Sequence, residues 1–271
     1  MENKISFEKS SFGKRMKSML KVDFRRMLKS KLFYILIACA LVIPILMTVM
    51  MTMMDGSVSV DPQTGAETVI HGPENAWQSI GTLPTADGAA MGGMDVMAMC
   101  NIDMMFMLVA VFICLFIAED FRSGYAKNLF TVRVRKGDYV ISKTLAGFMC
   151  GVFMLIAYFI GAMLGGAISS LSFDLGGLTA GNIAMCMTAK VFLMLVFVAI
   201  FVLVSVGAKQ KAWLSICGSL GGGMLLFMMV GVITPLSSTF VNVALCAAGG
   251  ALFAVGLGAI SRVVLKKTSL V

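Results

Sequence analysis

The sequence predicts an all-α polytopic membrane protein with six transmembrane helices and both termini in the cytoplasm. Composition is one reason, because 59% of the residues are hydrophobic and 13% are charged, whereas soluble domains carry about 25% charged residues. The placement of the bases is the other, because 21 of the 22 lysines and arginines lie in four segments that alternate with long apolar runs. These basic segments are 1–31, 119–143, 207–212 and 262–271.

The charges also predict the orientation of the chain. The loop 55–95 holds six acidic residues and no lysine or arginine, and basic segments are retained in the cytoplasm during insertion. We therefore expect this loop outside the cell and one transmembrane domain over 1–271, without a separate soluble domain. The net charge of +8 then reflects topology and attraction to anionic membrane lipids, and no nucleic-acid partner is expected.

A basic arm, 1–31, precedes the first span. Its part 12–31 places apolar side chains at helical spacing, with lysines and arginines over most of the remaining surface. The apolar positions are Met16, Met19, Leu20, Phe24, Met27 and Leu28. This pattern predicts an amphipathic helix that lies in the inner membrane interface. The alternative is that the bases serve topology alone.

Six apolar runs are long enough to cross a bilayer, which requires a helix of about 20 residues. The predicted spans are 32–54, 96–118, 144–168, 183–206, 213–233 and 240–261. Small residues recur at four-residue spacing on the third span, for example at Gly147 and Gly151 and again at Gly161 and Gly165. Such stripes let helices approach closely in lipid, so we expect a tightly packed bundle.

The outer loop contains a turn pattern at 61–65 between two short segments of β propensity, 57–60 and 68–71. These features predict a small hairpin outside the membrane.

Two charged residues stand within or beside the spans. The second span must extend outward through Asp103 to reach a sufficient length, and Lys190 is the one basic residue that is not on the inner side. The favoured interpretation is that Lys190 extends to the outer surface. The alternative is that Lys190 pairs with Asp103 or Asp174 around an outward-opening cavity.

Residues for catalysis are scarce in this sequence. His71 is the sole histidine and lies in the outer loop, so a His-based metal site or a nucleophile with a histidine base is excluded. The glycine cluster 221–223 is not followed by the lysine of a phosphate-binding loop. We therefore expect no catalytic residue, no metal site and no cofactor bound by this chain, which cannot hydrolyse ATP by itself.

The segment 119–143 joins the second and third spans and mixes aromatic with basic residues. We expect a short helix at Phe121–Phe130 that projects from the bundle and docks to a cytoplasmic partner. The alternative is a loop whose bases serve topology alone.

This segment carries a family resemblance. The matching positions are Glu119, Asp120, Gly124, Lys127, Asn128, Leu129, Arg135 and Lys143, together with the stretch Leu20–Ile37. On these residues the chain resembles the membrane subunits of type 2 ATP-binding-cassette (ABC) exporters. It is most similar to small bacterial permeases associated with lantibiotic immunity, bacitracin-type resistance and peptide or drug efflux. Tyr125 stands where the family usually has threonine, and Val132 or Val134 where proline is common.

The resemblance implies an export complex in the bacterial cytoplasmic membrane. Two permease chains, identical or different, would associate with two separate ATPase subunits that hold the ATP and Mg²⁺. The substrate would be a hydrophobic or amphiphilic compound such as a peptide, an antibiotic or a lipid-like molecule. The residues expected to contact the ATPase are Phe121, Arg122, Gly124, Lys127, Asn128 and Leu129. Arg133 and Arg135 are expected to contact lipid phosphates or the partner.

Other functions remain open from the sequence. An ATP-independent secondary transporter would favour paired intramembrane charges and an internal repeat, and no convincing repeat is present. A non-transporting immunity protein would capture cationic peptides at the acidic outer loop. An intramembrane enzyme is the weakest alternative, because the histidine is outside the spans.

Overall fold

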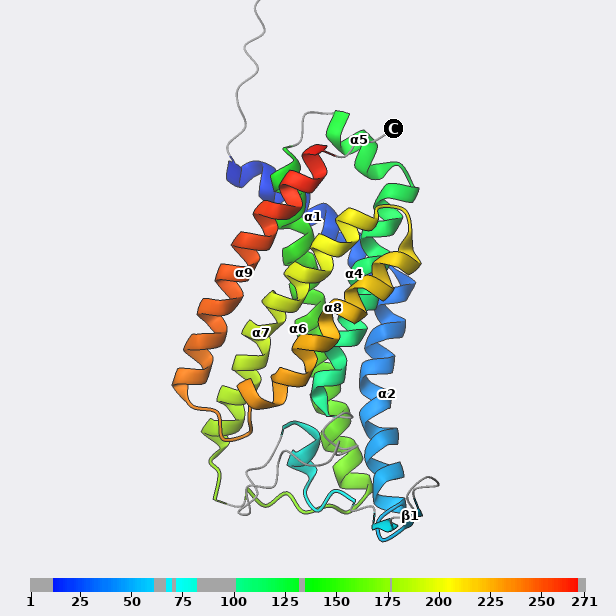
Figure 1. Ribbon diagram of the computed structural model, residues 1–271, viewed down its shortest axis with the longest axis vertical. Helices are drawn as coiled ribbons and strands as arrows, with labels where there is room; N and C mark the ends of the chain where they lie inside the picture. Colours follow the sequence, from blue (N-terminus) through cyan, green and yellow to red (C-terminus); the bar gives the residue numbers. More distant parts are fainter. Residues whose placement is uncertain are drawn as a thin grey trace, which may run out of the picture.

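The computed structural model describes residues 12–60, 67–69, 72–81, 101–131, 135–175 and 177–267. It is an elongated bundle of helices, and α1, α5 and the C-terminal part of α9 lie at one end, whereas the strands β1 and β2 lie at the other (Figure 1). We call these the α5 end and the hairpin end.

The first two helices are α1, Phe12–Lys29, and α2, Lys31–Met53. They are separated at Ser30, whose backbone is extended (φ −76°, ψ 124°) and begins a new helix in a different direction. The helix α2 is almost wholly apolar, as the first predicted span requires.

The predicted outer hairpin is present. The strands β1, Val58–Val60, and β2, Glu67–Val69, pair in antiparallel fashion with Ser59 opposite Thr68. The predicted turn at 61–65 lies outside the described residues. A 3₁₀ helix, η1 (Ala76–Ser79), then packs against α6.

The segment around the predicted docking helix differs from the expectation. A 3₁₀ turn, η2 (Ile102–Met104), leads into α4, Met105–Arg122, and a separate helix, α5, covers Tyr125–Thr131. The prediction of one helix at Phe121–Phe130 is therefore wrong. Gly124 lies between α4 and α5 with φ +71°, a left-handed conformation that ends the first helix.

The remaining helices are α6, Lys136–Ile168, α7, Ala180–Ala208, α8, Ala212–Ile233, and α9, Phe240–Lys267. Six helices of the described chain, namely α2, α4 with η2, and α6 to α9, are long and apolar enough to cross a membrane. Six helices thus match the six predicted spans, although residues 96–100 of the second predicted span lie outside the described residues and 102–104 form the 3₁₀ turn η2. The third is longer than predicted, because α6 already begins at Lys136, inside the predicted loop 119–143.

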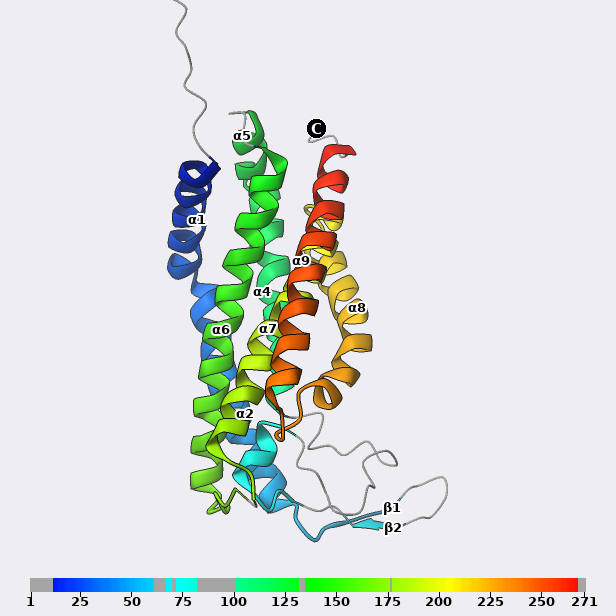
Figure 2. The same ribbon diagram turned by 90° about the vertical axis from the view of Figure 1, so that its left-hand side faces the viewer.

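The helices α4 and α7 form the centre of the bundle, with α1, α2 and α6 on one side and α8 and α9 on the other (Figure 2). Phe106 of α4 stacks on Phe197 of α7 with ring centroids 4.4 Å apart. In contrast, α8 and α9 expose large apolar side chains such as Leu225 and Val255, which are 80% and 75% exposed. Such faces are suited to lipid or to a second membrane subunit.

The small residues of α6 do allow close helix approach. A Cβ atom at Gly161 would lie 2.2 Å from the backbone oxygen of Leu41 in α2, and a Cβ at Gly165 would lie 3.0 Å from Ile45 Cα. Nearer the α5 end, a Cβ at Gly151 would lie 2.7 Å from Met194 Sδ in α7. The stripe of α6 therefore contacts two different helices.

Candidate functional site

The helix α1 packs against α6 through one face that contains an acidic residue. Met19, Asp23 and Met27 are buried on this face, each one helical turn from the next. The arm forms a helix where one was predicted, but the structure places Met19 and Met27 of the expected apolar stripe against α6 and not on an open surface. Leu28, which was predicted to share the stripe, is 46% exposed.

Asp23 is fully buried and is held by two residues of α6. Its Oδ1 atom lies 2.7 Å from Lys143 Nζ, and its Oδ2 atom accepts a hydrogen bond of 2.5 Å from Ser142 Oγ. The ion pair therefore joins α1 to α6. It is shielded from solvent, because Lys143 is itself 2% exposed.

Lys143 also pairs with a second carboxylate, Asp120 of α4. The distance from Lys143 Nζ to Asp120 Oδ2 is 2.7 Å, and the same oxygen accepts a hydrogen bond of 3.0 Å from Tyr139 Oη. The other oxygen, Oδ1, lies 2.6 Å from Nη1 of Arg26 in α1. We call these six residues the charge network: Asp23, Arg26, Asp120, Tyr139, Ser142 and Lys143.

Aromatic rings complete the charge network and connect it to α5. The guanidinium of Arg26 lies 4.2 Å from the ring centroid of Tyr125, and Lys143 Nζ lies 4.1 Å from that of Phe116. Cations over aromatic faces are stabilised electrostatically when they are desolvated. Tyr125 is the first residue of α5, so the charge network includes contacts from α1, α4, α5 and α6.

The charge states of the groups outside the spans follow from this environment. Burial lowers the pKa of Arg26, but the Asp120 carboxylate, with its hydrogen bond, and the nearby Tyr125 and Asp23 together raise that pKa more, so that it lies above the ordinary value. The guanidinium is therefore charged. Burial, with a further contribution from the Asp23 carboxylate, raises the pKa of Tyr125. The phenol consequently stays neutral, and the face of its ring forms a cation–π contact with the Arg26 guanidinium.

The charge network is balanced, with two carboxylates against one ammonium and one guanidinium. Burying charge is costly unless each charge is paired and hydrogen-bonded, and here both carboxylates have at least two partners. Removal of one member would leave an uncompensated charge in the interior. The arrangement therefore holds the four helices in one relative position.

Two further contacts connect the start of α6 to its neighbours. Arg15 Nε of α1 lies 3.1 Å from Asp138 Oδ2. Lys136 Nζ donates a hydrogen bond of 2.7 Å to the backbone oxygen of Leu265 in α9. The first turn of α6 is thus tied to both ends of the described chain.

The residues expected to contact an ATPase separate into exposed and buried groups. Arg122, Lys127 and Asn128 are exposed at the α5 end. Gly124 and Leu129 are half-buried, and Leu129 packs against the core. Phe121 is 9% exposed, with its ring 6.5 Å from that of Tyr139, so in this conformation it is a core residue and not a surface contact.

The two arginines expected to contact lipid or a partner have different outcomes. Arg133 lies outside the described residues. Arg135 is the exposed residue immediately before α6, where it has an extended backbone.

The intramembrane charges meet inside the bundle. Lys190 Nζ of α7 forms an ion pair with Asp103 Oδ1 of η2, and both side chains are buried. The backbone N–H of Asp103 donates a hydrogen bond of 2.9 Å to Asn101 Oδ1. The interpretation that Lys190 extends to the outer surface is therefore wrong, because desolvating the ammonium is offset by a carboxylate partner.

The sequence analysis missed Asp23, which is one of three acids in an arm that also holds ten lysines and arginines. A signal was present, because Asp23 follows Met16 and Met19 and precedes Met27 at helical spacing. An acid within an apolar stripe indicates a buried partner. Lys143 and Asp120 were recognised as family-like positions, but their contact with each other was not predicted.

The fold is that of a multi-pass helical membrane protein with a charged end that carries α5. In the described segments, no group of three or more metal-ligating side chains lies together. The family model for ABC-2 family transporter proteins matches residues 19–225. The chain therefore belongs to this family and is a permease of the ABC-2 type. The matched range includes the whole charge network. Comparison with curated proteins and with solved structures gave no match in either set.

Proposed function

We propose that this permease is the membrane subunit of a bacterial exporter that moves a hydrophobic or amphiphilic substrate out of the cell. Association with ABC ATPase subunits is general in the family. The proposed complex has two permease chains and two ATPase subunits in the cytoplasmic membrane, with the α5 end in the cytoplasm. The charges support this orientation, because described basic residues gather at the α5 end.

The observation that carries the proposal is the position of α5. This short helix exposes Lys127 and Asn128 at the end of the bundle, beside the exposed Arg122 at the end of α4. Its other side contacts the charge network through Tyr125, and its Phe130 ring lies 5.4 Å from that of Tyr139. A surface that can meet a soluble partner is thus directly joined to the interior of the bundle.

The mechanism is a mechanical coupling. An ATPase that moves α5 displaces Tyr125 and Phe130, and these rings displace Arg26 and Tyr139 in α1 and α6. Because the charge network tolerates few arrangements, α1, α4 and α6 move together. The helix bundles of the two permease chains then open a path outward between them. ATP drives this change when it binds one arrangement of the complex more tightly than the other.

The link between α4 and α5 provides a test. We expect Gly124→Val to lower substrate-stimulated ATP turnover of the assembled transporter roughly tenfold, because a β-branched residue at φ +71° costs about 1–2 kcal/mol and reorients α5. The measurement is ATP hydrolysis by permease and ATPase co-purified in lipid nanodiscs, with amphiphilic peptides as substrates. A Cβ at Gly124 would have no atom within 4 Å, so the effect is on the backbone and not on packing.

The matched control is Gly124→Asn, because asparagine adopts the left-handed conformation more readily than other residues. It should retain most of the stimulated turnover, and both variants should insert and fold as the wild type does. Equal turnover in Gly124→Val and wild type would contradict a role of α5 in coupling.

The buried Lys190–Asp103 pair favours a second candidate, an ATP-independent transporter. Intramembrane ionisable pairs are frequent in ion-coupled transport. The two candidates are separated by reconstituting the permease alone in vesicles with an imposed ion gradient. Transport without any ATPase would favour the second candidate and contradict the first.

A further inference from the structure

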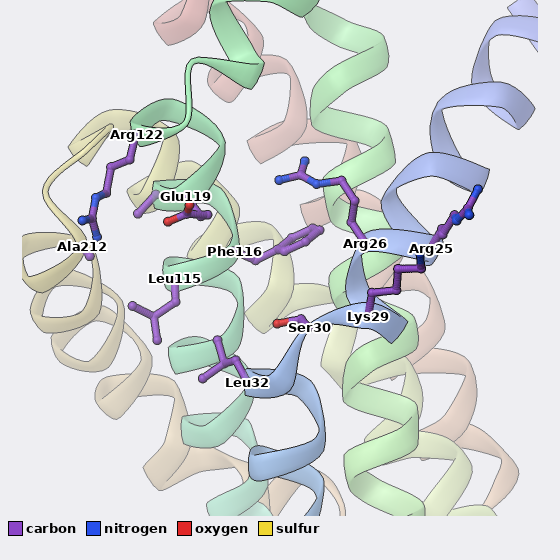
Figure 3. Close-up of a pocket in the computed structure, with 11 residues that line it drawn as sticks. Arg25, Arg26, Lys29, Ser30, Leu32, Leu115, Phe116, Glu119, Arg122 and Ala212 are labelled. Atoms are coloured by element: carbon purple, nitrogen blue, oxygen red, sulfur yellow. The ribbon is translucent and has the colours of Figure 1, made fainter.

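A cavity of about 560 Å³ lies at the α5 end, between the α1–α2 junction, α4 and the start of α8 (Figure 3). In Figure 3 the Phe116 ring points from α4 toward α1, Ser30 lies at the α1–α2 junction, and Leu32 and Leu115 lie beside them. The cavity is next to the charge network, because Arg26 and Phe116 belong to both.

The charges that line the cavity are mainly positive. They come from Arg25, Arg26, Lys29 and Arg122, against the single carboxylate of Glu119. Arg26 is neutralised by Asp120. No ion pair is formed by Arg25, Lys29 or Arg122 with any described residue. In Figure 3 the Arg25 side chain extends from α1 away from Phe116, and Arg122 lies on the opposite side, near Ala212. The unpaired cations therefore surround the rim of the cavity, where their positive charge attracts an anion.

Two helix N-termini add to this positive potential. The helix α2 begins just after Ser30 and α8 begins at Ala212, and both of these residues line the cavity. Neither helix has a side-chain capping bond or an acidic residue in its first turn. The first N–H groups of a helix carry partial positive charge and favour anions, above all phosphate.

The cavity also has the residues that are typical of a membrane interface. Leu32, Leu115 and Phe116 give it an apolar wall. Tyr34 and Trp213, close to the starts of α2 and α8, are 58% and 68% exposed. Tyrosine and tryptophan concentrate at the boundary between headgroups and hydrocarbon, and exposed apolar side chains continue from there along α2 and α8.

We propose that this cavity binds the phosphate-bearing headgroup of an acidic phospholipid, whose acyl chains lie along the exposed faces of α2 and α8. The N-terminus of α2 and the cations around the rim would hold the headgroup, and the apolar wall selects a lipid over a water-soluble phosphate. This inference does not depend on coupling to an ATPase. Occupancy would nevertheless place an anion beside Arg26, and so would favour a particular arrangement of the charge network.

The test measures lipid binding by the purified permease in detergent, by native mass spectrometry with phosphatidylglycerol and phosphatidylcholine as probes. We expect phosphatidylglycerol to bind at least tenfold more tightly than phosphatidylcholine. The double variant Arg25→Glu/Lys29→Glu should weaken phosphatidylglycerol binding about tenfold or more, because a basic residue near an anionic lipid contributes about 1 kcal/mol.

The matched control is Lys17→Glu/Lys21→Glu, which changes the charge of the same helix equally. Both lysines are exposed and neither lines the cavity, so binding should change less than twofold. Arg122→Gln, compared with Lys127→Gln on α5, provides a second pair whose changes are confined to α4 and α5. It keeps the test decisive if the double variant at the cavity does not fold.

Three results would overturn the proposal. One is equal affinity for phosphatidylglycerol and phosphatidylcholine. Another is equal weakening by the cavity variants and their controls, which would indicate diffuse attraction to the basic surface. The third is efficient displacement of the lipid by glycerol phosphate at equal concentration, which would identify a soluble phosphate as the ligand.

Discussion

Lys143→Met is expected to lower the free energy of unfolding by about 3–5 kcal/mol, the usual result of removing one partner from a buried ion pair. Lys143 Nζ is the shared partner of Asp23 and Asp120, at 2.7 Å from each. The methionine fills similar volume, so the loss comes from the charge and not from a cavity. The measurement is unfolding of the purified permease by titration with sodium dodecyl sulfate in mixed micelles, followed by circular dichroism.

Two comparisons give this prediction its specificity. Lys127→Met removes an exposed lysine of α5 and should change the free energy of unfolding by less than about 0.5 kcal/mol. Asp23→Asn in the Lys143→Met background should recover part of the stability, because Asp120 retains Arg26 and Tyr139 while Asp23 has lost its counter-charge. Strictly additive effects of the two substitutions would contradict direct coupling.

The charge network also explains why a permease would keep costly charges inside. An apolar core between α1, α4 and α6 would tolerate sliding, whereas ion pairs with two or three hydrogen-bonded partners fix the relative register of the helices. In the proposed cycle, a small displacement of α5 then moves all four helices together. A buried pair at Lys190 and Asp103 would have the same effect between α7 and η2.

Hydropathy was sufficient to predict the spans, because a bilayer-crossing helix must be apolar along about 20 residues. It was not sufficient at the start of α6, where Asp138, Ser142 and Lys143 ended the predicted span. Hydropathy treats each polar side chain as if it faced solvent or lipid. In the fold these three groups pair with Arg15 and Asp23 and are buried, so the helix continues through them.

The site was predicted in outline but not in its connections. The aromatic residues of the segment after α4 suggested a docking surface, yet Phe121 and Phe130 contact Tyr139 and contribute to the core. Only the tertiary contacts distinguish an aromatic residue that meets a partner from one that anchors the helix. The exposed residues Arg122, Lys127 and Asn128 remain the predicted partner contacts.

The position of α2 depends mainly on one glycine-rich contact. Its principal neighbour is α6, and the two helices approach closely at Gly161, where a Cβ would lie 2.2 Å from Leu41 O and 2.7 Å from Pro44 Cγ. Backbone atoms cannot adjust as a flexible side chain does, so a larger residue must push the helices apart. Without close packing, little else holds helices together in lipid.

Gly161→Leu is therefore expected to destabilise the permease by about 3 kcal/mol, at the upper end of the usual cost of overpacking. The same detergent titration measures the change. The matched control is Gly256→Leu in α9, where a Cβ would have no atom within 4 Å. Both substitutions gain helix propensity to a similar degree, so the difference between them isolates the contact with α2. If the two variants had equal stability, α2 would not be held by this close approach to α6.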